Sequence, residues 1–160
     1  MKSGNDCRDL IRHFESCVLK AYPDPATNGP PITIGYGHTG PEVRMGDTLT
    51  PPEAEALLAL DLIRFERGVD DMLRRDVTQS QFDALVSLAF NIGLGNLKGS
   101  TLMKRLNAGE DAAAQEQFLV WNRAASQVMK GLQRRRKAES LVFSGFDADM
   151  AISEAMRELP

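Results

Sequence analysis

The chain has 160 residues, of which 42% are hydrophobic and 26% are charged, and its formal net charge is −3. This length is typical of one domain, and the hydrophobic fraction can form a core, which excludes an intrinsically disordered protein. The slight negative charge disfavours a general polyanion binder, so we expect no nucleic-acid partner. No apolar run approaches the roughly 20 residues of a membrane span, and residues 1–6 lack the apolar region of a signal peptide. We therefore expect a soluble protein made in the cytosol.

The two cysteines and two histidines do not have the spacing of a metal site. Cys7 and Cys17 are ten positions apart in a segment that reads as one helix, which separates them by about 15 Å along its axis. A disulfide needs Cα atoms within about 7 Å, so we expect none between them. Neither Cys-x-x-Cys nor His-x-x-x-His occurs, so we expect no zinc site.

The N-terminal part of the chain predicts a helix followed by a small β-region. Apolar side chains recur at helical spacing over residues 6–18, and the prolines at positions 23 and 25 stop the helix before them. Residues 20–46 are rich in Pro, Gly, Thr, Ile and Tyr, which is typical of turns and short strands. Within them, residues 32–36 alternate as a strand does, with both isoleucines on one face and Thr33 on the other.

The rest of the chain predicts helices. Thr50 and Thr78 each begin a capping box, and the helix after Thr50 is expected to end near Gly68. The run from Phe82 to Ile92 is apolar on nearly every face, so it is the predicted central core helix, ended by Gly93 and Gly95. Shorter helices are expected over residues 100–106, 111–121, 133–143 and, capped by Asp147, 150–159. Helices around one small β-region predict an α+β, mostly α, fold.

A basic run, Arg-Arg-Arg-Lys, occupies residues 134–137. We expect a solvated or carbonyl-capping face of a helix, as for most charge runs. The alternative is a surface that contacts an anionic polymer.

Glu15 is the first candidate catalytic residue. It lies beside Phe14 near the C-terminal end of the first predicted helix. The negative end of the helix dipole and partial burial both favour the protonated carboxyl, which could then act as a general acid. An ordinary surface glutamate is the alternative.

Asp24 and Thr33 are the next candidates. Asp24 lies between two prolines, which stiffen the backbone around a carboxylate able to act as a base or electrostatic partner, while plain turn chemistry is the alternative. The Thr33 hydroxyl could hold a water molecule, or it could be a solvated strand residue. His38 lies in the glycine-rich segment 35–40, where we expect a structural bond to a nearby acid rather than catalysis.

Together these residues resemble the phage-type lysozymes, the endolysins of glycoside hydrolase family 24 from T-even and lambdoid phages. The resemblance rests on Glu15 in Phe-Glu-Ser, Asp24 in Ala-Tyr-Pro-Asp, and Thr33 in Thr-Ile-Gly-Tyr-Gly-His-Thr-Gly. It covers roughly residues 8–145 and continues through the segments 81–93, 99–102, 121 and 131–139. The sequence departs from the family at Ser16, at Ala125-Ser126, where the family has Gly-Gly, and in a longer loop over residues 25–32.

The resemblance implies a lysozyme-like fold over residues 1–145. A β-containing lobe would cover about 19–48, a helical lobe about 69–145 together with the N-terminal helix, and the active-site cleft would lie between them. Residues 146–160 would form a C-terminal helical extension outside the resemblance.

The implied activity is hydrolysis of the β-1,4 bond between N-acetylmuramic acid and N-acetylglucosamine in peptidoglycan, which lyses the host cell. Glu15 would be the general acid, Asp24 and Thr33 would position the water, and the outcome would be inversion. Phe90 and Ser100 match sugar-contacting positions, with core and N-cap roles as alternatives. Two carboxyl groups supply the acid–base chemistry, so no metal or organic cofactor is expected. A lytic transglycosylase and a non-catalytic peptidoglycan-binding module are the alternative functions.

A substrate outside the inner membrane and the absence of a signal peptide together imply a release step. We expect a monomer that accumulates in the host cytoplasm and acts on the periplasmic cell wall. It would reach the wall after a holin-like membrane protein opens the membrane.

Overall fold

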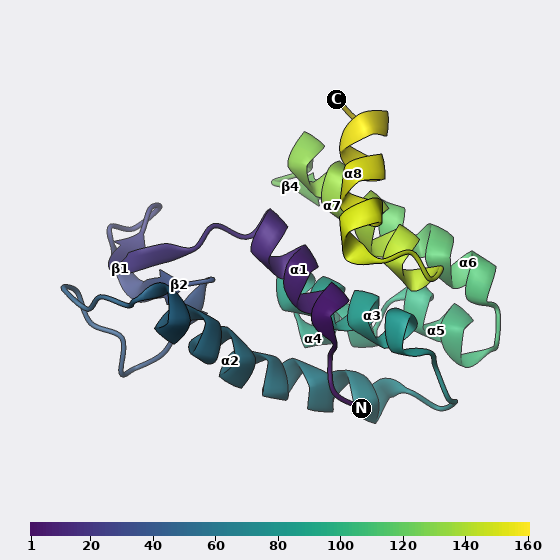
Figure 1. Cartoon of the computed structure of the whole chain (residues 1–160), viewed down its shortest axis with the longest axis horizontal. Coiled ribbons are helices and arrows are strands. Elements are labelled where there is room, and N and C mark those ends of the chain that lie inside the picture. The colour runs from purple at the N-terminus through teal and green to yellow at the C-terminus, as the bar shows by residue number, and fades with distance from the viewer. The chain divides into compact units, whose positions relative to one another are not determined.

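The computed structural model describes residues 1–160 and divides them into two compact units. One unit is Ile11–Arg64, and the other combines Met1–Leu10 with Phe65–Pro160. The α+β, mostly helical, class is confirmed (Figure 1). The elements in chain order are α1 (Asn5–Phe14), β1 (Val18–Asp24), β2 (Gly29–Gly35), β3 (His38–Thr39), α2 (Pro51–Met72), α3 (Gln79–Ile92), α4 (Leu94–Lys98), α5 (Thr101–Asn107), α6 (Asp111–Glu116), the 3-10 helix η1 (Gln117–Val120), β4 (Arg123–Ala124), β5 (Gln127–Val128), α7 (Lys130–Phe143) and α8 (Ala148–Glu158).

The Ile11–Arg64 unit contains an antiparallel sheet with strand order β1-β2-β3, which lies beside the start of α2 (Figure 1). Its small core consists of Ala21, Ile34 and Val43. Ile32 is partly buried against the same cluster, so the two isoleucines of β2 share the core face as their alternation predicts. The residue between them is therefore directed to the other face of the sheet.

The first helix is shorter than the sequence predicts. α1 ends at Phe14, and Val18 already belongs to β1. Val18 satisfies the helical spacing, but its β-branched side chain also suits a strand, and pairing with β2 decides the outcome. Glu15 therefore follows α1 instead of lying within it. Cys17 lies beyond the helix end, so the single-helix argument does not apply to it; both Cys7 and Cys17 are free thiols.

The second helix is longer than expected. α2 begins after Thr50, whose backbone N–H donates to the Glu53 carboxylate at 2.7 Å, which agrees with the predicted capping box. It continues past Gly68 to Met72. A Cβ atom at Gly68 would lie 2.6 Å from the Leu94 side chain, so this glycine permits close packing and does not end the helix.

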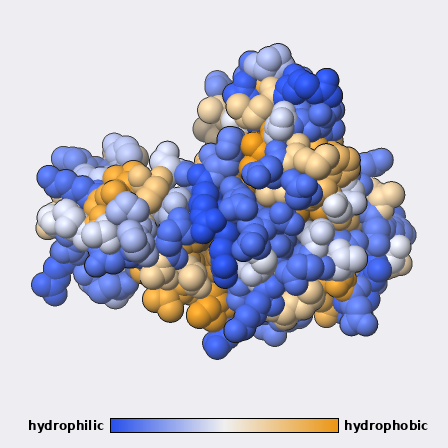
Figure 2. Space-filling model, in the orientation of Figure 1, coloured by the Kyte–Doolittle hydropathy of each residue, from blue (hydrophilic) through white to orange (hydrophobic).

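Apolar surface remains on α2. Figure 2 shows it over the middle of the helix, where Leu60 and Ile63 are exposed. No helix of the structure combines the length and the apolar character that crossing a bilayer requires.

In the second unit, α3 is the buried central helix that its apolar run predicts. The capping box between Thr78 and Gln81 is complete, and the residues from Gln81 to Ala89 are buried. α3 ends at Gly93 as expected, but Gly95 lies inside α4, so its predicted role as a terminator is wrong. Residues 100 and 147 cap α5 and α8 through their side-chain oxygens, as predicted.

The C-terminal part contains two features that the helical pattern does not predict. The segment expected as one helix over residues 111–121 divides into α6 and the 3-10 helix η1. A short hairpin of β4 and β5 then precedes α7, which begins three residues before the predicted start. The two turn residues, Ala125 and Ser126, have positive φ angles of 47° and 67°. α7 contacts both α3 and α8 (Figure 1).

The basic run on α7 is not the solvated face that the sequence predicts. Arg135 and Arg136 are only 2% and 0% exposed and form ion pairs with the buried Glu139. Successive residues of a helix point about 100° apart, so a run of four covers every side and must include the core. The carbonyl-capping part of the prediction is correct for Arg134, whose Nε donates to the Leu159 carbonyl oxygen at 2.6 Å. Contact with an anionic polymer is excluded for the two buried arginines.

Candidate active site

Glu15, Asp24 and Thr33 all belong to the Ile11–Arg64 unit. Glu15 directly follows α1, and its backbone N–H donates to the Ile11 carbonyl oxygen at 2.8 Å, which continues the last helical turn. Asp24 is the last residue of β1, and Thr33 lies on the adjacent β2. All three residues are partly exposed.

A tight turn holds the Asp24 carboxylate. Its Oδ1 atom accepts the backbone N–H of Ala26 at 2.8 Å, and its carbonyl oxygen accepts the N–H of Asn28 at 2.7 Å. This is the turn chemistry that the sequence offered as an alternative. The turn uses one carboxylate oxygen, so the other can still face a substrate.

Thr33 is central in the three-stranded sheet. It pairs with Tyr22 on β1 and with Thr39 on β3. Directly opposed residues of an antiparallel sheet share a face, so these three side chains lie on the face opposite the isoleucines. Tyr22 precedes Asp24 by two residues, which connects this face to the end of β1.

The glycine-rich turn presents His38 to two carboxylates. Gly35 and Gly37 have φ angles of 65° and 86°, a region that favours glycine. His38 Nδ1 lies 2.8 Å from Asp61, and Nε2 lies 2.8 Å from Glu42. Burial lowers the pKa of His38, but the bonds to Glu42 and Asp61 outweigh it and raise this pKa above its usual 6.5. The predicted structural pairing of His38 is confirmed.

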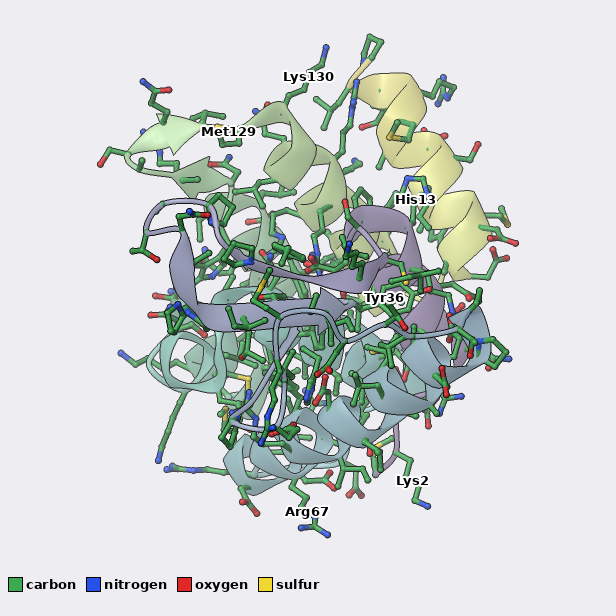
Figure 3. The ribbon with its side chains drawn as sticks, turned by 90° about the vertical axis from the view of Figure 1, so that its left-hand side faces the viewer. Lys2, His13, Tyr36, Arg67, Met129 and Lys130 are labelled. Atoms are coloured by element: carbon green, nitrogen blue, oxygen red, sulfur yellow. The ribbon has the colours of Figure 1, made fainter.

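Glu55 on α2 joins the end of α1 to the glycine-rich turn, which no sequence pattern predicts. It accepts hydrogen bonds from the Arg12 guanidinium, at 2.6 Å for the shortest, and from the Tyr36 hydroxyl at 2.7 Å (Tyr36 is labelled in Figure 3). Burial, the hydrogen bond to Glu55 and the nearby Cys17 together raise the pKa of Tyr36 to about 12. Tyr36 could have been singled out from the sequence, because it lies between two glycines of the glycine-rich motif. No local pattern singles out Glu55.

Phe90 and Ser100 lie in the other unit. The Phe90 ring packs against Phe65, with ring centroids 5.2 Å apart. Ser100 Oγ accepts the backbone N–H of Met103 at 3.1 Å, as an N-cap does. The alternative structural roles are therefore present, and contact with sugar stays a prediction for both residues.

No group of three or more His, Cys, Asp and Glu side chains is arranged to hold a metal ion. The chemistry available around β1 and β2 is that of carboxyl, hydroxyl, phenol and imidazole groups. These groups suit proton transfer and water positioning.

Comparisons with known proteins show what this chain is similar to. The endolysin of Bacillus phage B103 is 47% identical over 135 residues, which are 84% of this chain and 51% of that protein, so the chain spans about half the length of this relative. The muramidase domain of SpmX from Asticaccaulis excentricus superposes with a TM-score of 0.80 at 35% identity, over 89% of this chain and 97% of that one. The endolysin of Escherichia coli O157:H7 phage FAHEc1 gives a TM-score of 0.80 at 34% identity, over 91% and 94%. The family model named phage lysozyme matches residues 12–139. The chain therefore belongs to the phage lysozyme family.

Proposed function

We propose that this chain is a peptidoglycan hydrolase that cleaves the β-1,4 bond between N-acetylmuramic acid and N-acetylglucosamine. The observation that carries the proposal is the family match over residues 12–139, which includes Glu15, Asp24 and Thr33. These residues occupy neighbouring segments of one unit, and all three are partly exposed. The endolysin and muramidase relatives support the same reaction class.

In the proposed mechanism, Glu15 protonates the leaving glycosidic oxygen. Asp24 and the Thr33 hydroxyl orient the attacking water, and Asp24 also stabilises positive charge that develops on the sugar. A water molecule between two carboxyl groups requires a separation of about 6.5–9.5 Å and gives inversion of the anomeric centre. Phe90 and Ser100 are proposed sugar contacts.

The test is lysis of permeabilised Gram-negative cells by purified wild type and by Glu15→Gln. The amide has nearly the same shape but cannot donate the proton, so the rate should fall by about 100-fold or more. Glu116→Gln, which changes an exposed carboxylate on α6, is the control and should retain wild-type activity. A folded Glu15→Gln variant with more than about a tenth of the wild-type rate would contradict the role of Glu15.

Product analysis separates the alternative functions. Hydrolysis releases reducing muramic ends, and proton NMR of the fresh products reports inversion or retention. Anhydro-muramyl ends would instead identify a lytic transglycosylase. Binding to purified peptidoglycan without any cleavage would identify a binding module.

We further propose that the protein is a monomer that reaches the cell wall from the cytoplasm after a holin-like membrane protein opens the membrane. Several relatives carry the name SAR-endolysin, and secretion without a holin is the alternative route for this chain. Cells that express this chain with and without a holin distinguish the two routes. Lysis without a holin would contradict the proposed route, and light scattering after size exclusion measures the oligomeric state.

A further inference from the structure

We propose that Glu55 is a positioning residue for Glu15, because it ties the last turn of α1, directly before that carboxyl, to α2 and to the glycine-rich turn. This inference rests on the proposed function in giving Glu15 a catalytic role. The hydrogen bonds of Glu55 to Arg12 and Tyr36, which we call the clamp, can be tested without measuring the reaction. All of its members belong to the Ile11–Arg64 unit.

The first anchor lies before Glu15. Arg12, on the last turn of α1, directs its Nε atom to Glu55 Oε1 and Oε2 at 3.1 and 3.0 Å and its second guanidinium nitrogen to Oε2 at 2.6 Å. A planar guanidinium facing both oxygens of a carboxylate restricts orientation as well as distance. Arg12 precedes Glu15 by three residues, about one helical turn. The end of α1 is therefore held to α2.

The second anchor comes from the glycine-rich turn between β2 and β3. The Tyr36 hydroxyl donates to Glu55 Oε1 at 2.7 Å. The same carboxylate therefore receives both the Arg12 guanidinium and the Tyr36 hydroxyl. Glu55 thus joins the end of α1, α2 and the turn after β2, and it restricts the path of the chain directly before Glu15.

The clamp contributes more to geometry than to stability. The Arg12 and Glu55 side chains are 41% and 36% exposed, and pairs in contact with solvent contribute little to the free energy of unfolding. A displacement of about 1 Å at a catalytic group, in contrast, can reduce the rate by about 100-fold. Loss of activity with nearly unchanged stability therefore distinguishes positioning from a general structural role.

Glu55→Gln is the test variant, because the amide still accepts from Tyr36 but loses the charge and one acceptor for Arg12. The matched control is Asp61→Asn, which breaks a different tie between α2 and the sheet, the one to His38. Hydrogen exchange measures protection of the Glu15 amide, which donates to Ile11. We expect that protection to fall about tenfold in Glu55→Gln and to stay within about twofold of wild type in Asp61→Asn.

Kinetics and a double-mutant cycle complete the test. In Glu55→Gln we expect kcat to fall at least about tenfold while KM stays within about twofold. Tyr36→Phe should have a smaller effect, and the Tyr36→Phe/Glu55→Gln double variant should be less impaired than the product of the two single effects. Arg12→Lys, which keeps the charge but not the fork, serves as a second variant if Glu55→Gln does not fold.

Unchanged protection of the Glu15 amide in Glu55→Gln, or an equal loss in Asp61→Asn, overturns the clamp. Unchanged kcat in Glu55→Gln while Glu15→Gln is inactive overturns the positioning role alone. Absence of cleavage by the wild type contradicts the proposed function instead, and hydrogen exchange then still decides whether the clamp exists.

Discussion

Ser87 on α3 donates a 2.8 Å hydrogen bond to Glu139 on α7, and both side chains are fully buried. The same carboxylate oxygen accepts from Arg135 Nε at 3.0 Å and from an Arg136 guanidinium nitrogen at 3.1 Å. One buried carboxylate thus serves three buried donors and ties the central helix to α7. The charged part of the core is therefore organised around Glu139.

Glu139→Gln should destabilise the protein strongly, by about 3–5 kcal/mol, because it removes the negative charge beside two buried guanidinium groups. Chemical denaturation measures the free energy of unfolding. Lys137→Gln on the same helix is the control, since its pair with Glu158 is partly exposed and its loss should cost less than about 1 kcal/mol. Equal effects of the two substitutions would contradict the central role of Glu139.

His38 should make stability depend on pH near neutrality. Its pKa is raised in the folded state, so the folded protein binds the proton more tightly than the unfolded chain. The contribution is complete below the unfolded pKa of about 6.5 and is lost as the pH rises through the folded pKa. Asp61→Asn should therefore lower Tm more at pH 5.5 than at pH 9. A loss of Tm that is equal at both pH values would show that the charge of His38 has no part in this pairing.

Thr33→Val should reduce peptidoglycan hydrolysis by about 100-fold, because valine keeps the shape and strand preference but cannot orient water. Binding to peptidoglycan should persist, and Thr33→Ser should retain most of the activity. Thr39→Val, at the directly paired position on β3, is the control and should leave the rate unchanged. Full activity of Thr33→Val would indicate that its hydroxyl is only a solvated strand group.

Ala125→Gly should stabilise the protein by about 0.5–1 kcal/mol. Ala125 has a φ angle of 47° in the two-residue turn between β4 and β5, a conformation that costs about 1–2 kcal/mol for residues other than glycine. The added flexibility of the unfolded chain offsets part of this gain. Ala124→Gly, in β4 itself, lacks the positive φ angle and should destabilise slightly. Denaturant unfolding of the two variants should therefore shift in opposite directions.

Several elements could be predicted because their determinants are local. The capping box of Thr78 and Gln81, the caps at Ser100 and Asp147, and the alternation around Thr33 each depend on residues within a few positions. The predicted catalytic residues are recognisable for the same reason, since each lies within a short motif of the phage lysozyme family. Family membership could therefore be inferred before any coordinates.

The remaining features depend on residues that are distant in sequence. Val18 joins a strand because β2 offers a partner, and Gly68 stays helical because Leu94 packs against it. Arg135 and Arg136 are buried because Glu139 pairs with both and the Ser87 carbonyl oxygen accepts from Arg135. Local patterns thus determined the helices, the strand alternation and the motif residues. Only tertiary packing decided where α1 and α2 stop, which charges of α7 are buried and that Arg12 and Tyr36 meet at Glu55, because these outcomes depend on partners that the local pattern does not contain.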